Sequence, residues 1–173
     1  MRRYLPLLLL PFAVQASAQA VSALKGHDTG APVDIDADRV EVQQRTDRAV
    51  FSGNVHAVQG NLKLDAERLR VAYVTQPGSG NPQIQRIDAD GGVTMTSPSE
   101  RASGRYGIYD VNKRVITVIG GVTLTRGDSV AHGGRLVMDL DSGRSTLDGG
   151  TVGGTGGSSG RVSGRFTVPQ RNN

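Results

Sequence analysis

Residues 32–71 read PVDIDADRVEVQQRTDRAVFSGNVHAVQGNLKLDAERLRV, and in parts of this stretch apolar side chains recur at every second position. The apolar members of this alternation are Val33, Ile35, Ala37, Leu62, Leu64, Leu69 and Val71. The carboxylates of Asp34, Asp36 and Asp38 alternate with the first three of them. Because successive side chains of a β-strand point to opposite faces, the pattern predicts strands with one apolar face and one face in water.

A similar design repeats along the chain with a period of about 30 residues. An Arg followed by an apolar residue recurs, and its positions are Arg39, Arg68, Arg105, Arg135 and Arg165. One interval is longer than the others, and it contains the turn-rich stretch TQPGSGNPQ at residues 75–83. We interpret this stretch as a loop inserted into the repeat.

Glycine-containing dipeptides run in step with the arginines. They are Gly53-Asn54, Gly91-Gly92, Gly120-Gly121 and Gly149-Gly150, and we interpret them as tight turns between strands. Leu62, Ala66, Leu69 and Tyr73 also fit a helical stripe, but the β-branched run VAYVT that follows favours a strand. The sequence therefore predicts an all-β protein of about nine to fourteen short antiparallel strands with almost no helix.

Composition supports this fold class and excludes several functions. The 24 glycines among 173 residues disfavour a helical bundle, whereas 36% hydrophobic residues can supply a folded core. With no cysteine, disulfides, thiolate metal sites and thiol nucleophiles are all excluded. The formal net charge of +4 becomes smaller once Arg2 and Arg3 are removed, so no nucleic-acid partner is expected.

The first twenty residues, MRRYLPLLLLPFAVQASAQA, have the basic start, short apolar run and small residues of a secretory signal peptide. Cleavage after Ala18 and cleavage after Ala20 fit equally well. A membrane anchor would need roughly 20 consecutive apolar residues, and this run is much shorter and holds two prolines. We expect export to the periplasm.

The organisation that we predict after this signal peptide has four parts. A short lead covers residues 21–31 and a β-domain covers residues 32–148. A glycine-rich tether at residues 149–164 then leads to a C-terminal strand and tail at residues 165–173.

The chain carries no recognisable catalytic or metal-binding constellation. The only G-x-S-x-G match lies at residues 156–160 inside the tether, where no strained strand-to-helix turn could hold a nucleophile. His27, His56 and His132 are isolated from one another, and we expect solvated side chains. The run Asp34, Asp36, Asp38 lacks the glycine and the final glutamate of a calcium loop. We expect neither an enzyme nor a cofactor.

Residues 32–71 contain four short motifs whose combination is informative. They are P-[VI]-x-I-x-[AS]-D at residues 32–38, F-[ST]-G-N-V at 51–55, VQG at 58–60 and A-[DE]-[RK]-[LV] at 66–69. Weaker similarity continues through residues 92–93, 106–110 and 118–120. With these motifs the chain resembles the OstA-like family of periplasmic lipopolysaccharide-transport proteins. The glycine-rich C-terminal segment and the few aromatic residues depart from the family pattern.

This resemblance implies an open, twisted β-jellyroll whose stacked strands enclose an apolar interior. It implies a protein that binds lipopolysaccharide by its acyl chains and passes it from an inner-membrane transporter to an outer-membrane translocon. The expected partners are an LptC-like component at the N-terminal edge and an LptD-like component at the C-terminal edge. Head-to-tail assembly of copies of the chain is a further possibility.

We predict that the inward side chains line a lipid-binding groove. They are Val40, Val42, Leu62, Leu64, Leu69, Val71, Val93, Met95, Ile108, Val122, Leu124, Leu136 and Met138. The alternative is that they pack a closed core, since alternation fits both arrangements. The recurrent arginines either bind lipid phosphates or are ordinary solvated residues of strand faces.

Edge strands are the predicted partner sites, because their unpaired backbone groups accept a strand from another chain. At the N-terminal edge they involve Val33, Ile35 and Ala37. At the C-terminal edge we consider residues 136–140, with Leu136 and Met138, and the tethered residues 166–168, with Phe166 and Val168. The competing function is that of a structural, exported β-repeat protein that binds no lipid.

Overall fold

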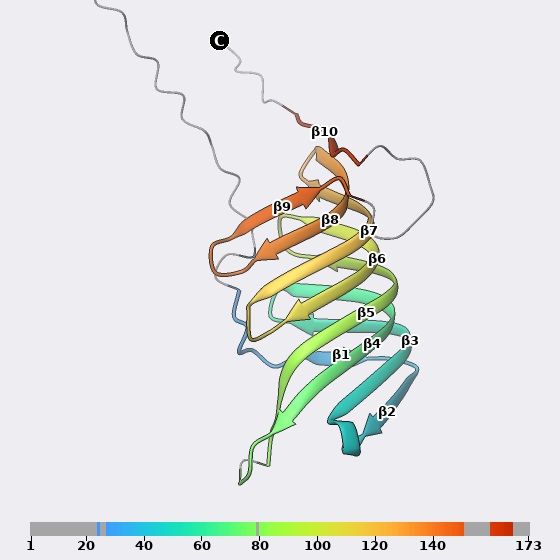
Figure 1. Ribbon diagram of the computed structural model, residues 1–173, viewed down its shortest axis with the longest axis vertical. Helices are drawn as coiled ribbons and strands as arrows, with labels where there is room; N and C mark the ends of the chain where they lie inside the picture. Colours follow the sequence, from blue (N-terminus) through green and yellow to red (C-terminus); the bar gives the residue numbers. More distant parts are fainter. Residues whose placement is uncertain (1–23, 25–26, 79, 151–159, 168–173) are drawn as a thin grey trace, which may run out of the picture.

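The computed structural model describes residue 24 and residues 27–78, 80–150 and 160–167 (Figure 1). Its ten strands and a single 3-10 turn are β1 (Asp34–Asp36), β2 (Arg39–Gln43), η1 (Gln44–Thr46), β3 (Arg48–Gln59), β4 (Leu62–Thr75), β5 (Pro82–Thr96), β6 (Arg101–Asp110), β7 (Val115–Arg126), β8 (Ser129–Asp139), β9 (Arg144–Asp148) and β10 (Ser163–Arg165). No α-helix occurs among these residues, and the predicted all-β class is confirmed.

All strands belong to one open antiparallel sheet with the order β1-β3-β4-β5-β6-β7-β8-β10. Two short strands lie off this path, since β2 pairs with β3 and β9 pairs with β8. Figure 1 shows the consequence, a stack in which the long strands bend sharply on the right-hand side. From β2 to β9, neighbouring strands in sequence pair with each other, so the repeat seen in the sequence becomes a repeat along the stack.

Gly53-Asn54, Gly91-Gly92 and Gly120-Gly121 are corners within strands, so our interpretation of these three dipeptides as turns between strands is wrong, whereas Gly149-Gly150 follows the end of β9. The register shifts by bulges at Ser52/Val55, Asp90/Val93 and Ile119/Val122, within β3, β5 and β7. Gly91 has a φ of 87°, and a Cβ there would lie 2.4 Å from the Cβ of Glu67. Only glycine allows this positive φ together with this close approach, so the strand bends where the sequence suggested it would end.

The corners divide the sheet into two wings. The β2–β9 wing consists of β2, β9 and residues 48–52, 68–75, 82–90, 106–110, 115–119 and 135–139. The β1–β10 wing consists of β1, β10 and residues 55–59, 62–66, 93–96, 101–104, 122–126 and 129–133. The strands are therefore longer than predicted, because each of the central ones crosses both wings.

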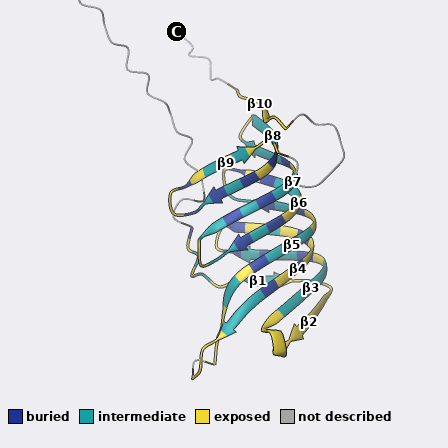
Figure 2. Cartoon of the chain, viewed as in Figure 1, coloured by how far each residue is buried: buried dark blue, intermediate teal, exposed yellow. Residues whose placement is uncertain are grey.

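Apolar side chains of the two wings meet in one core. Its buried members include Val55, Leu69, Val93, Leu136 and Met138. Figure 2 shows the buried residues in dark blue within the stack, while β2 and η1 at its lower end are exposed. The predicted inward faces of the strands thus form the core, and Asp34 and Asp36 lie exposed on the outer face of β1 as expected.

The two ends of the stack are edges made of short strands. β1 and β2 form the N-terminal edge, in agreement with the prediction for Ile35. β9 and β10 form the C-terminal edge, so the prediction that Leu136 and Met138 belong to an edge strand is wrong. Leu136 pairs with Leu147 of β9, and both Leu136 and Met138 are fully buried. The sequence could not show that a further strand follows.

The last part of the chain differs from the predicted layout. β10 ends at Arg165, so Phe166 follows the strand and is exposed, while Val168 lies outside the described residues. Gly149 approaches Gly160 so closely that a Cβ on Gly149 would lie 2.3 Å from the Gly160 carbonyl oxygen. The chain therefore leaves the sheet after β9 and returns to it at the same place. The predicted signal peptide lies outside the described residues.

Candidate functional site

The apolar interior is built from rows of cross-strand partners. One row on the inner face of the β2–β9 wing is Val40, Phe51, Leu69, Ala89, Gly107, Val118, Leu136 and Leu147. Directly opposite residues of antiparallel strands share a face, so every member of this row faces the same way. The row crosses the whole wing from edge to edge without a charged residue.

Two more rows have the same character. The second row of the β2–β9 wing is Val42, Ala49, Val71, Ile87, Tyr109, Ile116, Met138 and Ser145. A row of the β1–β10 wing is Ile35, Ala57, Leu64, Met95, Ala102, Leu124, Ala131 and Gly164. Together the rows form an apolar surface that reaches both ends of the stack.

The two wings pack closely over most of this surface. Between them lies a cavity of about 40 Å³, bordered by Leu64 and Met95 from one wing and Leu69, Ile87 and Val118 from the other. A water molecule needs roughly 10–15 Å³ of such space, so the cavity has room for a few waters and not for an acyl chain. The interior of this state is therefore filled by the protein's own side chains.

The N-terminal end of the stack is open. A hollow of about 770 Å³ is bordered there by Val42, Phe51, Val71, Tyr73 and Ile84 among others. Val40 and Val42 have their place in the inner rows, but they are 55% and 58% exposed. Their exposure follows from the position of β2, which is an outermost strand with no further strand beside it.

The predicted groove residues lie on the inner face with the exception of Ile108. Ile108 borders the small cavity, but it stands between the buried residues Gly107 and Tyr109 and pairs with Asp88 and Thr117 of the outer face. The prediction that its side chain points inwards is therefore wrong. The bulge in β6 between Ser103 and Tyr106 shifts the alternation after Gly104, and the sequence does not reveal this shift. Contact of the other residues with lipid remains a prediction.

Tyr109 is the polar residue that the apolar rows bury most completely. Its side chain is 6% exposed, and its hydroxyl has no hydrogen-bond partner among the described residues. Burial raises the pKa of Tyr109 to about 12, because the phenolate would lose its hydration, while the charge of Arg114 acts in the opposite direction. The phenol therefore stays neutral at physiological pH.

A segment before β1, which the sequence analysis left as a plain lead, also belongs to the interior. Leu24 is 1% exposed and is part of the core cluster, and His27 is 7% exposed. The expectation that His27 is solvated is therefore wrong, because its Nε2 lies 3.0 Å from Oε1 of Gln59. This contact joins residues 32 positions apart in sequence, and no local sequence pattern predicts it.

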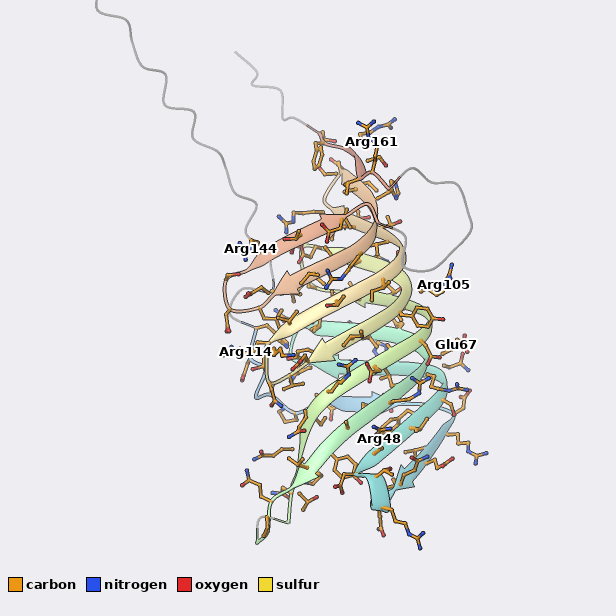
Figure 3. The ribbon with its side chains drawn as sticks, in the orientation of Figure 1. Arg48, Glu67, Arg105, Arg114, Arg144 and Arg161 are labelled. Carbon is orange, nitrogen blue, oxygen red and sulfur yellow. The ribbon has the colours of Figure 1, made fainter. Side chains whose placement is uncertain are left out.

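The recurrent arginines lie on the outer face. Arg39, Arg68 and Arg135 belong to one outer row of the β2–β9 wing, and all three are exposed. Figure 3 shows Arg105 beside the corners and Arg114 and Arg144 near the loops on the opposite side. The side chains of Arg39, Arg68, Arg135 and Arg165 belong to outer rows, so these arginines do not line the interior.

Other chemistry is sparse. The described residues contain no group of three or more potential ligands that could hold a metal ion. Within the same residues, no helix is long and apolar enough to span a bilayer. Glu100 is buried and pairs with Arg126 between the β5–β6 and β7–β8 loops, which ties these two loops together.

Residues 34–144, well over half of the chain, match the family described as LptA/(LptD N-terminal domain) LPS transport protein. The chain belongs to this family. The resemblance to OstA-like proteins, and to LptA among them, is therefore confirmed. The family is one of LPS transport components and not an enzyme family. The match ends at the first residue of β9, so β10 lies beyond the family's common part.

Individual relatives of the family agree with this assignment. An uncharacterised protein of Rhizobium meliloti (strain 1021) is 35% identical over 127 residues, which cover 70% of this chain and 68% of that protein. The LPS-assembly protein LptD of Yersinia enterocolitica is 34% identical over 83 residues, which cover 48% of this chain and 10% of LptD. The match thus covers about half of this chain and about a tenth of LptD.

A solved structure shows the same fold. It is the crystal structure of LptH from Pseudomonas aeruginosa, the periplasmic LptA homologue of a lipopolysaccharide transport device. The TM-score is 0.69 at 16% sequence identity, and the match covers 82% of this chain and 99% of LptH. At this identity the likeness concerns the fold, the jellyroll of stacked antiparallel strands.

Proposed function

We propose that this protein binds lipopolysaccharide by its acyl chains between the two wings and carries it through the periplasm. In this role it receives the lipid from an inner-membrane transporter and delivers it to an outer-membrane translocon. Membership in a family of LPS transport proteins supports the cargo. The predicted signal peptide supports the compartment.

The observation that carries this proposal is the continuity of the apolar rows. Exposing each buried CH₂ group to water costs roughly 0.8 kcal/mol, so a lipid with several acyl chains cannot cross an aqueous compartment unprotected. A row such as Val40 to Leu147 offers an apolar surface from the first edge of the stack to the last. An acyl chain that slides along it stays shielded throughout.

Binding requires the wings to part, because the closed interior leaves only about 40 Å³. The strand ladders run within each wing, and the wings are joined by the corners at the glycine dipeptides. When the side opposite to the corners opens, the side chains of the two wings lose contacts with each other and gain contacts with lipid. The backbone ladders remain paired during this movement.

Partner proteins bind at the two edges of the sheet. An LptC-like component adds to β1 and β2, and an LptD-like component or another copy adds to β9 and β10. Charges favour a second copy, because the outer row that starts at Asp34 ends at Arg165, and the row that starts at Arg39 ends at Asp148. Stacked head to tail, two copies bring opposite charges together on both wings.

Photo-crosslinking along one strand tests the cargo. A photoreactive residue at Leu124 or Met95, on the inner face, is expected to form an adduct with lipopolysaccharide. The adjacent positions Thr123 and Thr94 point to the outer face and serve as matched controls without adduct. Failure of every inward position to capture lipid would contradict the proposal.

A structural β-repeat protein without lipid cargo is the second candidate. The observation in its favour is the close packing of the interior, in which Leu69, Leu136 and Met138 have no exposed surface. Lipid binding by the purified chain discriminates between the two functions, since a permanently closed core binds none.

A further inference from the structure

A segment formed by Leu24 and residues 27–31 lies on the side of the stack that the corners leave open. In Figure 1 the corners lie on the right, while this segment runs down the left side toward β1, beside the loops that join the strands. Leu24 inserts into the core cluster with 1% of its surface exposed. The segment is therefore held by the interior itself, although it belongs to no strand.

Gln59, at the end of β3, clasps this segment with both ends of its amide. Its Nε2 donates to the carbonyl oxygens of Thr29 at 3.1 Å and Ala31 at 2.9 Å. Its Oε1 contacts Nε2 of His27 at 3.0 Å. Gln59 is only 6% exposed, so these bonds satisfy a buried amide and are costly to lose without replacement.

The clasp lies at the small cavity between the wings. Gln59 borders this cavity together with Leu62, Leu64 and Val33. The segment also folds back on itself, since the amide of His27 donates to the carbonyl of Leu24 and the amide of Ala31 donates to that of Asp28. Leu24 and residues 27–31 thus form a compact strap that is bonded to Gln59 at the border of the cavity.

We propose that this strap, Leu24 together with residues 27–31, is an internal occupant of the lipid site, which an acyl chain must displace. This inference rests on the proposed function and adds a closed state to it. Leu24 fills apolar space in the absence of lipid and keeps the interior from water. A fatty acyl chain buries far more apolar surface than one leucine side chain, so the cargo outcompetes the strap once it arrives.

The strap also explains how an apolar groove stays soluble while it is empty. Large exposed apolar surfaces favour association with other proteins and membranes. With the strap in place, Val40 and Val42 at the N-terminal end are the exposed large apolar side chains of the inner rows, within the residues that the structure describes. Cargo loading and strap release are therefore coupled steps.

Gln59→Ala, which removes the clasp, and Leu24→Ser, which removes the apolar anchor, test the closed state. We expect the affinity for the apolar dye N-phenyl-1-naphthylamine to rise roughly five- to tenfold in each full-length variant, as befits the loss of buried hydrogen bonds or of a buried apolar anchor. Gln83→Ala alters an exposed glutamine of the β4–β5 hairpin and is the surface control. Dye binding equal to that of the unaltered protein in both strap variants would overturn the inference.

A distance measurement separates release of the strap from simple enlargement of the cavity. The chain has no cysteine, so Asp28→Cys and Lys63→Cys introduce a unique pair of sites for nitroxide labels. The distance between the labels is expected to lengthen in Gln59→Ala, and in the unaltered background after addition of lipopolysaccharide. Leu64→Ala enlarges the same cavity and leaves the clasp intact, so it is expected to keep the short distance.

The outcomes distinguish the two proposals. Lipid adducts at Leu124 with an unchanged label distance would overturn the strap and leave the proposed function standing. Absence of adducts at all inward positions, with strap variants that bind more dye, would overturn the lipid cargo and with it the displacement by acyl chains. Circular dichroism of each variant checks that the sheet is formed.

Discussion

At the level of single residues, Tyr109 is the least expected part of the interior. A hydroxyl without a partner inside an apolar row costs free energy, roughly 1–3 kcal/mol for an unsatisfied buried group. Its neighbours along the row are Ile87 and Ile116, which pack against an aromatic ring and cannot form a hydrogen bond with its hydroxyl. Such a group is tolerated because the ring itself fills the row.

Tyr109→Phe is expected to change the alkaline stability of the protein. The folded-state pKa of about 12 exceeds the ordinary value of 10.0, so the unfolded chain loses this proton first as the pH rises. The free energy of unfolding that depends on the protonation of Tyr109 is therefore fully present below pH 10 and is lost between about pH 10 and 12. This loss amounts to about 2–3 kcal/mol in total. Urea titrations at pH 8 and at pH 11 check this.

The phenylalanine variant should lack most of this loss and should be as stable as the unaltered protein, or more stable, at pH 8. Equal alkaline losses in both proteins would show that Tyr109 does not cause the pH dependence. Asp139, with a pKa lowered by the amide of Ser142, titrates far below this range and does not interfere.

At the level of elements, the corners decide the architecture. A strand of 15 residues such as β5 would be a flat, two-sided surface without its bulge, and the stack would have no interior. Gly91 and Gly92 both have positive φ, 87° and 84°, but only Gly91 approaches another strand, at Glu67. The bend therefore depends on two separate properties of glycine, conformational freedom and small size.

Gly91→Ala and Gly92→Ala separate these two properties. Alanine at positive φ costs about 1–2 kcal/mol at either position. At Gly91 it adds a clash with Glu67, whereas no atom lies within 4 Å of a Cβ at Gly92. We expect Gly91→Ala to lower the free energy of unfolding by at least about 1 kcal/mol more than Gly92→Ala. Denaturant titrations measure this difference, and equal losses would exclude a role for the close approach.

The strands were predictable from the sequence, but the corners were not. Alternation at Leu62/Leu64 and at Leu69/Val71 specifies a strand with a buried face, and the loop between β4 and β5 lies within the predicted stretch 75–83, whose ends belong to the two strands. A glycine dipeptide, however, supplies positive φ for a turn and for a bulge alike. The choice depends on whether the next strand pairs across the dipeptide, which is a long-range property.

The candidate site could be predicted only in part for the same reason. The inward faces follow from alternation, yet the burial of Leu136 and the exposure of Val40 depend on which strands are outermost. Ile108 is misplaced because a bulge changes the phase of the alternation. The clasp of Gln59 on His27 joins distant residues through side-chain hydrogen bonds, for which the sequence contains no periodic signal.

At the level of the whole molecule, the two edges of the stack are complementary in charge and in strand direction. Asp34 and Arg165 terminate the same outer row at opposite ends of the stack, and both side chains are exposed. β10 and β1 also run in opposite directions, since every pairing between them along the stack is antiparallel. A second copy would therefore extend the sheet with its established geometry.

Charge reversal in trans tests this match. Asp34→Arg and Arg165→Asp are each expected to weaken self-association roughly five- to tenfold by placing like charges together. In an equimolar mixture of the two variants, every junction between unlike variants pairs opposite charges, so dimers should be regained, as analytical ultracentrifugation can measure. If the single variants associate as strongly as the unaltered chain, the head-to-tail contact does not use these edges.

The contact between Gly149 and Gly160 has a consequence for engineering. Because the chain departs and rejoins at one point, the length of what lies between is geometrically uncoupled from the rest of the fold. A fluorescent protein or an affinity peptide inserted between Gly149 and Gly160 would lie outside the sheet, next to its C-terminal edge. Such a marker would let the protein be followed in living cells without a change to the apolar rows of its interior.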